Sequence, residues 1–491
     1  MSTKVRPAAP GGANIPAVGR GQEAPDVTTE TDRRETRSKR DARTADPAVM
    51  ADALLRNCTL DGVSRFLFWR GTFRLWDRGA YREVADSESK ATIVGMLNRT
   101  YRHLGRRVVG DVLEQLRAKT LMAAAKEPPA WIGRGNAPRP WAPREVLSTR
   151  GGLVHLSSAA AGKTDCTIPP TPRFFTTVAL DYSFQPDAPA PRGWLRFMEE
   201  LWGDDAESVA TLQEWMGYLL TPDTKQQKIA MLIGPKRSGK GTIARVLRQL
   251  IGPENVAGPT LASLSTNFGL APLLNKSLGI ISDARLSSRT DATTVVERLL
   301  SISGEDALTI DRKHREPLTS QLSARLMLLS NELPRLPDTS EAMSSRFLLL
   351  HLTESFYGRE DPGLSDKLLT ELPGILRWAI EGWRRLRERG RFVQPVSGEE
   401  LATHLAEIGS PLAAFVRERC TVGPGQRETV DALYAAWGHW CRSKGREPGN
   451  HQRFGRDLRT AVPGLRDVRP RGQEGGRQRG YEGVALTPPE G

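Results

Sequence analysis

The sequence contains few cysteines and no long apolar stretch. Its four cysteines are too far apart to match a zinc-binding pattern, so we predict free thiols in a reducing compartment. They are Cys58, Cys166, Cys420 and Cys441. Because no run of 18 apolar residues occurs, we expect no membrane-spanning helix and no membrane partner. The N-terminal residues also lack the apolar core of a secretory signal, so we expect a cytoplasmic protein.

Aromatic residues are absent from residues 1–47, which are rich in Pro, Gly, Thr and charged residues. Such a segment buries too little apolar surface to offset its loss of conformational entropy, and we predict a disordered tail. The remaining chain is too long for a single hydrophobic core, so we expect two to four domains in all.

Acidic residues are outnumbered, since 70 Lys and Arg face 57 Asp and Glu and give a formal charge of +13. This balance favours a polyanionic partner such as nucleic acid. Codon bias in a GC-rich genome would also explain why Arg outnumbers Lys. Charge alone therefore does not decide the partner.

Periodic apolar patterns divide the rest of the chain. Residues 48–180 begin with short aromatic strands and a helix over 87–104, which together indicate an α/β region, and residues 127–173 look like surface loops. Two stripes at helical spacing predict a helical domain at 181–225. A further helix over 368–386 and a linker would fill 356–400.

Residues 228–233 form a buried strand that leads directly into a glycine-rich loop and then a helix over 243–251. Strand, glycine turn and helix N-terminus together bind phosphate, because backbone N–H groups converge on the anion and a lysine reaches its terminal oxygens. A chance glycine turn is the alternative. The predicted ATP-binding residues are Gly234, Pro235, Lys236, Arg237, Ser238, Gly239, Lys240, Gly241 and Thr242.

Two positions in this region are candidate Mg²⁺ ligands. The hydroxyl of Thr242 lies one position later than in the usual motif, as in some nucleotide kinases. Asp283 ends a second apolar strand, and in P-loop ATPases such an acid holds Mg²⁺ directly or through water. A third strand over 326–330 leads into Asn331, which either orients the attacking water or caps a turn before Pro334.

The order of these elements resembles a superfamily 3 helicase of the phage/plasmid primase–helicase family, related to the poxvirus-type replicative ATPase. The resemblance covers residues 180–385. Its elements are the P-loop, the acidic strand, Ser303-Gly304-Glu305-Asp306, Arg312-Lys313-His314, Ser330-Asn331-Glu332-Leu333-Pro334 and Ser344-Ser345-Arg346-Phe347. It implies an α/β, AAA+-like core at 226–355 that forms a ring, commonly a hexamer, and uses ATP with Mg²⁺.

The resemblance also assigns roles to single residues. Asn331 would be the sensor, and Arg346 would reach the ATP of the neighbouring subunit, although a surface salt bridge also suits an arginine there. Arg312, Lys313 and His314 would grip single-stranded DNA from a hairpin, with His314 the weakest of the three because turn histidines are often merely solvated.

One departure from the family leaves the general base unassigned. Ala284 stands after Asp283, where related ATPases often have a second acid. Glu305 and Asp306 are the candidates that the sequence offers instead.

Residues 401–491 carry three helical stripes and then a basic hairpin, which suggests a winged-helix-like domain that reads duplex DNA. Residues 441–480 contain 11 Lys or Arg and 4 Asp or Glu, in keeping with that role. A basic protein-interaction domain is the alternative.

These patterns predict an ATP-dependent DNA helicase for replication of a phage, plasmid or integrated element. A primase–helicase in one chain is disfavoured, because residues 1–180 show neither a zinc cluster nor an Asp-x-Asp strand, so a separate primase would be a partner. The other hypotheses are a small-substrate nucleotide kinase and an origin-binding initiator that uses ATP only for assembly.

Overall fold

The computed structural model describes residues 46–101, 104–133, 140–286, 290–334, 336, 342–468 and 479–488. The predicted tail at 1–47 lies outside this set except for its last two residues. The chain forms two compact units. One comprises residues up to Leu54 together with Lys90–Gln115, and the other comprises Leu55–Ser89 and the chain from Leu116 onward. In the described part of the chain, no helix has the length and apolar character needed to cross a membrane.

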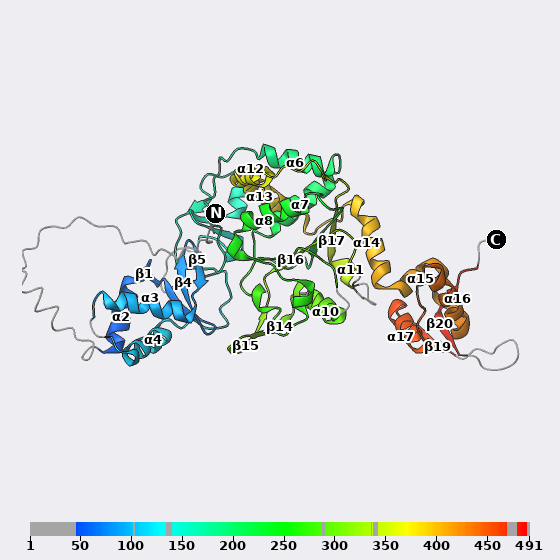
Figure 1. Ribbon diagram of the computed structural model, residues 1–491, viewed down its shortest axis with the longest axis horizontal. Helices are drawn as coiled ribbons and strands as arrows, with labels where there is room; N and C mark the ends of the chain where they lie inside the picture. The colour runs from blue at the N-terminus through cyan, green and yellow to red at the C-terminus, as the bar shows by residue number, and fades with distance from the viewer. Residues whose placement is uncertain are drawn as a thin grey trace, which may run out of the picture. The chain divides into compact units, whose positions relative to one another are not determined.

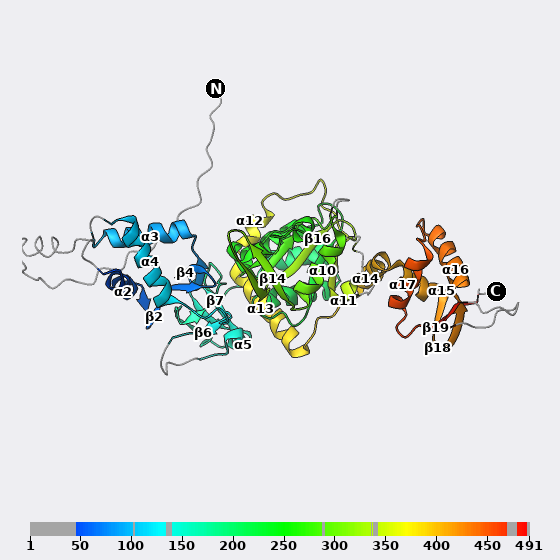
Figure 2. The ribbon, with the colours of Figure 1, turned by 90° about the horizontal axis from the view of Figure 1, so that it is seen from below.

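The smaller unit is helical, and its helices lie together in both views (Figures 1 and 2). They are α2 (Pro47–Asn57), α3 (Asp86–Asn98) and α4 (Arg106–Thr120), of which residues 55–57, 86–89 and 116–120 are assigned to the larger unit. Met50, Ile93 and Val112 are among its buried side chains. The single helix predicted over 87–104 therefore ends at Asn98, and a second helix follows it.

A five-stranded parallel sheet forms the centre of the larger unit. Its strands are β11 (Ile229–Ile233), β12 (Val256–Ala257), β13 (Leu278–Ile281), β16 (Arg325–Ser330) and β17 (Phe347–His351), in the order β12-β13-β16-β11-β17. Alternate residues enter different cores: Ala230 and Leu232 join one, and Met231 joins the other. Both faces are therefore covered, which explains why the strands read as continuous apolar runs. The predicted mixed α/β class is confirmed.

One face of the sheet packs against helices from both sides of the P-loop in sequence (Figure 1). These are α6 (Arg192–Trp202), α7 (Ala206–Tyr218), α8 (Lys240–Ile251), α12 (Leu364–Leu369) and α13 (Leu372–Arg389). Helices α7 and α13 touch through glycine, since a Cβ on Gly217 would lie 2.2 Å from the carbonyl oxygen of Ala379. The segments predicted at 181–225 and 356–400 thus form one helical layer.

The opposite face packs against shorter elements. They are α9 (Leu261–Leu264), α10 (Ala292–Ser303), α11 (Ala342–Arg346) and α14 (Val396–Gly409). A hairpin of β14 (Ala307–Arg312) and β15 (Arg315–Gln321) follows α10, as the sequence predicts. Helix α14 lies along β17, where Gln394 just before it exchanges two hydrogen bonds with the backbone of Leu349. This helix crosses the domain boundary predicted at 400.

Residues 55–180 contain more strands than the sequence predicts. The aromatic strands appear as β3 (Phe66–Trp69) and β4 (Thr72–Asp77), joined by β5 (Ala80–Glu83). Within the predicted loops at 127–173 lie a second meander and other short elements, because Leu147, Leu153 and Val154 are buried despite the surrounding prolines. The second meander consists of β7 (Val146–Thr149), β8 (Gly152–His155) and β9 (Thr167–Ile168), with the short helix α5 (Leu156–Ala160) after β8. Two further pairs are β1 (Thr59–Leu60) with β2 (Val63–Ser64), and β6 (Ala130–Trp131) with β10 (Phe174–Phe175).

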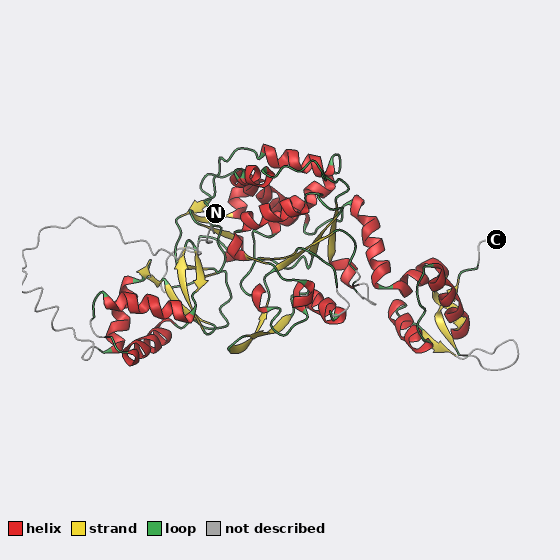
Figure 3. Ribbon diagram, in the orientation of Figure 1, coloured by secondary structure: helices red, strands yellow, loops and turns green. Residues whose placement is uncertain are grey.

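The C-terminal region combines three helices with a three-stranded antiparallel sheet (Figure 3). Its elements are α15 (Pro411–Arg419), β18 (Cys420–Thr429), α16 (Val430–Ser443), α17 (His451–Ala461), β19 (Arg466–Val468) and β20 (Gly480–Leu486), with β20 between β18 and β19. The helices carry the three predicted stripes, whereas β18 is not predicted. The basic turn predicted between β19 and β20 lies mostly outside the described residues.

Candidate functional site

The P-loop joins the end of β11 to the start of α8 at the carboxyl edge of the sheet. Gly239 precedes α8 with a φ of 85°, a left-handed conformation that favours glycine. At the start of the loop, a Cβ on Gly234 would lie 2.3 Å from the carbonyl oxygen of Leu352. Glycine is therefore favoured at both positions, by the left-handed backbone at Gly239 and by the close carbonyl group at Gly234. The N-terminus of α8 is exposed to an incoming anion, which its unpaired N–H groups favour.

The side chain of Lys240 folds back into this loop. Its Nζ donates hydrogen bonds to the carbonyl oxygens of Gly234 and Pro235, both at 2.7 Å, and to Oγ of Ser238 at 3.0 Å. Burial lowers the pKa of Lys240 from its ordinary value. Phosphate oxygens are stronger acceptors for an ammonium group than neutral carbonyls, so a phosphate in the loop would compete for this side chain.

The segment after β17 supports the P-loop from outside. Ser355 donates from Oγ to the carbonyl oxygen of Lys236 at 2.9 Å, and the N–H of Phe356 donates to that of Arg237 at 3.0 Å. Glu360 forms an ion pair with Arg237 at 3.3 Å. No sequence pattern predicts this support, because these residues lie more than a hundred positions from the loop.

Thr242, the predicted Mg²⁺ ligand, has an arginine beside its hydroxyl. Oγ1 of Thr242 accepts a hydrogen bond from Nη2 of Arg245 at 3.4 Å. Gly241, at the position usually occupied by the hydroxyl residue, has open space where a Cβ would stand. A cation as close as Arg245 opposes Mg²⁺ binding at Thr242, and this role remains a prediction.

Asp283 lies just after β13, and its surroundings favour the charged carboxylate form that a metal ion needs. Its carboxylate accepts a hydrogen bond from Nε of Arg285 at 2.9 Å, and this bond lowers the pKa of Asp283. The side chain is 59 % exposed, so Mg²⁺ could reach it. Arg285 would have to move away from Asp283 for a metal ion to take its place.

A cavity of about 850 Å³ opens at the same edge of the sheet, beside the P-loop. Gly234 and Pro235 line it together with Asn331, which the sequence assigns as the sensor. Its wall also includes Leu401 and Ile408 of α14. The fold therefore brings the start of the glycine-rich loop and the predicted sensor to one cavity large enough for a nucleotide, whereas Lys240, Thr242 and Asp283 are not among the residues that line it.

Glu332 is the carboxylate among the residues that line this cavity. It follows Asn331 in a turn held by Ser330, whose Oγ donates to the carbonyl oxygen of Glu332 and accepts from its N–H at 3.4 Å. The hydrogen bond that Arg285 donates to Asp283 chiefly raises the pKa of Arg285, and the charge of Glu332 contributes to the same shift. Sequence reasoning assigned no role to Glu332, although its place beside Asn331 at a strand end was the available signal.

Arg346 and Glu305 lie at the opposite, amino-terminal edge of the sheet. Phe347 of β17 pairs with Ile229 of β11, so Arg346 stands beside the beginning of the P-loop strand rather than its end. Its Nη1 donates to Oε1 of Gln227. The five residues of β11 span about 17 Å, which separates Arg346 from the P-loop of its own chain.

Glu305 accepts hydrogen bonds from Thr224 and Gln321 at this amino edge. Thr224 precedes β11, so Glu305 is as far from Lys240 as Arg346 is. Within one subunit Glu305 therefore lies at the edge opposite to the glycine-rich loop, because α10 and β14 meet at the amino edge, and a catalytic role for Glu305 or Asp306 stays a prediction.

The tip of the β14–β15 hairpin exposes Lys313 and His314, and His314 has a φ of 59°. Arg312 is held by its own chain instead: Nη1 donates to the carbonyl oxygen of Arg70 at 3.1 Å, and Nε donates to that of Glu316 at 2.9 Å. Of the three predicted DNA-binding residues, two are thus free to meet a phosphate backbone.

Helix α17 presents basic side chains on one side of the C-terminal region. Arg453 and Arg456 are 71 % and 76 % exposed, and Phe454 and Leu458 are buried on the other side. Asp457 pairs with both arginines, at 3.6 and 3.2 Å. These ion pairs are exposed and weak, so a nucleic-acid phosphate could replace them.

Comparisons with known proteins agree with this organisation. A family model described as a family of unknown function (DUF5906) matches residues 232–346, a segment that begins in β11 and ends at Arg346. The apo structure of the NrS-1 C terminal region aligns over 90 % of this chain and 99 % of that chain, with a TM-score of 0.51 and 15 % identity. The A form apo structure of the same region aligns over 89 % and 100 %, with a TM-score of 0.48 and 14 % identity. At this identity, the first alignment establishes a shared fold.

Proposed function

We propose that this chain is an ATP-hydrolysing DNA helicase of the superfamily 3, primase–helicase kind, which acts in replication of a phage, plasmid or other mobile element. The observation that carries the proposal is the cavity beside Gly234, which joins the P-loop, Asn331 and Glu332. The sheet order, with the P-loop strand between β16 and β17, resembles that of AAA+ ATPases.

In this mechanism the triphosphate of ATP lies over the N-terminus of α8. Lys240 leaves the carbonyl oxygens of Gly234 and Pro235 and donates to the phosphates. Mg²⁺, held by Asp283 and by Thr242 if Arg245 withdraws, would neutralise phosphate charge. Asn331 orients the attacking water.

Glu332 is the acid that we assign to activating this water. Ala284 cannot serve, and its methyl group is fully buried in the core. Glu305 lies at the other edge of the sheet. Glu332 lines the cavity beside the sensor, and a carboxylate there accepts a proton from the water as it attacks the γ-phosphate.

Arg346 would act on the ATP of a neighbouring subunit. Its position about 17 Å from its own P-loop excludes it from its own site and suits delivery in trans. A head-to-tail contact of this kind closes into a ring or continues as a filament, and we propose the ring.

DNA would be held at two places. Lys313 and His314 at the hairpin tip contact single-stranded phosphates, without reading sequence. The C-terminal order of helix, strand, two helices and two strands resembles a winged helix, whose third helix would be α17 with Arg453 and Arg456 exposed. This part would bind duplex DNA.

The test is ATP hydrolysis by the purified chain, with and without single-stranded DNA, across a salt series. We expect DNA to stimulate turnover and the stimulation to fade with salt, because phosphate contacts release counterions. Lys240→Ala protein is the control for contaminating activity. Turnover that ignores DNA would replace the helicase with an origin-binding initiator, and absence of turnover would overturn the ATPase.

A further inference from the structure

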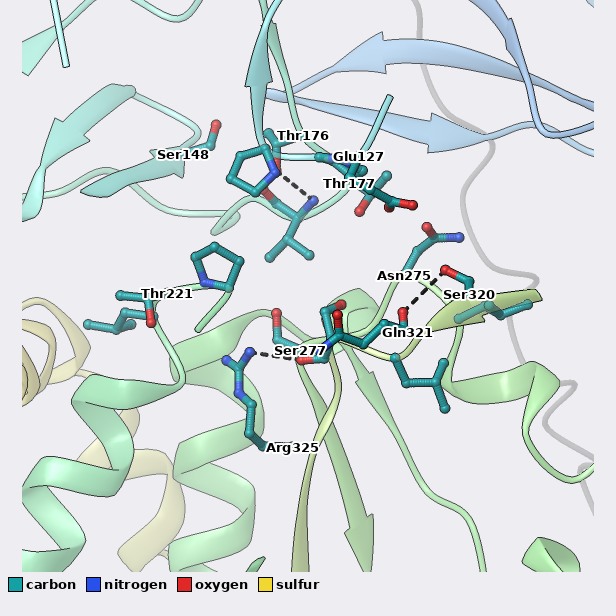
Figure 4. A pocket seen from close by; sticks show the side chains of 18 of the residues that line it. Glu127, Ser148, Thr176, Thr177, Thr221, Asn275, Ser277, Ser320, Gln321 and Arg325 are labelled. Atoms are coloured by element: carbon teal, nitrogen blue, oxygen red, sulfur yellow. Dashed lines mark hydrogen bonds between the residues drawn. The ribbon is translucent and has the colours of Figure 1, made fainter. Parts of the chain in front are cut away.

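A second pocket, of about 100 Å³, lies at the amino edge of the sheet, near the base of the β14–β15 hairpin (Figure 4). One wall comes from the core: Asn275 and Ser277 before β13, Gln321 at the end of β15 and Arg325 at the start of β16. The facing wall includes Thr177, which follows β10. The pocket is separate from the ATP cavity, which opens at the other edge.

The distinctive residue of this pocket is Arg325, a buried cation. Only 4 % of its surface is exposed. Its Nη1 donates to the carbonyl oxygen of Ser323 and its Nη2 to that of Leu219, both at 2.8 Å. Nε is buried without a hydrogen-bond partner. A guanidinium has five N–H groups, so three of them are unfilled.

The guanidinium also lacks an acidic partner within ion-pairing distance among the described residues. Asp223 acts on it only from farther away, and burial lowers the pKa of Arg325 to about 10. It is therefore still charged at neutral pH. A buried charge without a counterion is costly, and an anion that enters the pocket would remove that cost.

Part of the environment of Arg325 is structural and holds the side chain in place. Leu219 caps the C-terminus of α7, where a cation is favourable, and the guanidinium lies 5.4 Å from the ring centre of Tyr218. These contacts fix its direction into the pocket (Figure 4). They account for two of its N–H groups and leave the others to a ligand.

Neutral polar side chains also line this pocket. The side chains of Asn275, Ser277 and Thr177 line the pocket, and within the described chain they make no hydrogen bond. A second guanidinium, that of Arg70, reaches the rim, where it pairs with Glu127. The lining thus carries two positive charges and one negative charge, together with two amides, those of Asn275 and Gln321, and hydroxyl groups.

We propose that this pocket binds a phosphate group, held by Arg325 and the free side chains of Asn275, Ser277 and Thr177. A guanidinium fork with nearby hydroxyl donors matches phosphate oxygens. About 100 Å³ corresponds to roughly three water molecules, enough for a phosphate group but not for a whole nucleotide. That the phosphate belongs to a DNA strand passing the hairpin rests on the proposed function, whereas phosphate binding itself does not.

The experiment places a carboxylate in the pocket. Ser277→Asp puts a negative charge beside Arg325, and Asn275→Asp is a second, nearly isosteric variant, since Asn275 has a φ of 60° that Asp tolerates. Ser443→Asp, at an exposed position of α16, is the matched control. All three are made in Lys240→Ala protein, so that the P-loop contributes little to phosphate binding.

The first readout is the melting temperature in inorganic phosphate and in chloride at equal ionic strength. We expect phosphate to raise it for the Lys240→Ala parent and the Ser443→Asp control. The pocket variants should melt higher than the parent in chloride, because the carboxylate neutralises Arg325, and should lose the phosphate shift. A phosphate shift that survives in both pocket variants would overturn the proposal, whatever the ATPase assay shows.

The second readout identifies the source of the phosphate. A DNA phosphodiester predicts that both pocket variants bind an oligothymidylate about tenfold more weakly, as for loss of one charge-assisted hydrogen bond, with the salt slope reduced by about one. Loss of the inorganic phosphate shift with unchanged oligonucleotide binding would support the pocket and assign it to free phosphate.

Discussion

The two edges of the central sheet carry different kinds of site. At the carboxyl edge, Asn331 follows β16 directly, Asp283 lies two residues after β13, and Lys240 follows β11 after the short loop 234–239, so each belongs to a local pattern that the sequence shows. At the amino edge, Arg346 and Arg325 sit at the beginnings of strands and contact residues from distant parts of the chain. In our proposals, the carboxyl edge carries out chemistry within a single subunit, and the amino edge presents cations to a neighbouring subunit or to DNA.

The largest expected effect is at the carboxyl edge. Lys240→Ala should abolish ATP turnover, because it removes the Nζ that folds back into the loop at the start of α8, while the fold remains intact. Steady-state hydrolysis and circular dichroism check both parts. Turnover comparable to that of the parent protein would remove the P-loop from the mechanism.

Arg346→Ala tests whether the amino edge serves the ATP of a neighbour. We expect about a 10³-fold loss of kcat with ATP binding retained, as for loss of an arginine finger. Mixing this variant with Asp283→Ala protein should restore some turnover, since mixed rings contain one intact interface. Failure of every mixing ratio to restore activity would argue against a contribution in trans.

The pair of variants Glu332→Gln and Glu305→Gln tests which edge of the sheet supplies the acid that activates water. We expect about a 10²-fold loss of kcat with little change in ATP affinity, because the amide keeps the shape but cannot accept the proton. Glu305→Gln is the matched control at the amino edge and should leave the chemical step nearly unchanged. If Glu305→Gln impairs single-turnover hydrolysis as much as Glu332→Gln, our assignment of the acid is wrong.

The smallest effect is expected at the hairpin tip. Lys313→Ala should leave basal hydrolysis unchanged and reduce its stimulation by single-stranded DNA by a few fold, since about one phosphate contact is lost. Hydrolysis measured at increasing DNA concentration gives both values. An unaltered response to DNA would exclude the tip from the DNA path.

Sequence patterns predicted the elements of the carboxyl edge well. Each apolar run became a strand, since strands buried on both faces leave a clear signal, and the loop between β11 and α8 lies where its glycines indicate. The roles given to Thr242, Asp283, Asn331 and Arg346 are still predictions.

Other features have no local signature. Val146 and Leu153 belong to strands hidden among prolines, and β18 contains Gly423, Pro424 and Gly425, which read as a turn. Glu332 became a candidate only because it lines one cavity with Gly234 and Asn331, which are brought there by the fold. The pocket around Arg325 combines segments far apart in the chain, which no periodicity reveals.

Helix α14 connects the cavity beside the glycine-rich loop to the C-terminal region. Leu401 and Ile408 form part of the cavity wall, and only Ser410 separates α14 from α15 of the C-terminal region. The helix is about 21 Å long, so a tilt of about 5° at one end displaces the other by roughly 2 Å. Helix α14 thus connects the wall of the cavity to the C-terminal region. Under the proposed function, a force that DNA applied to that region would reach α14 and, through Leu401 and Ile408, the place where ATP would bind.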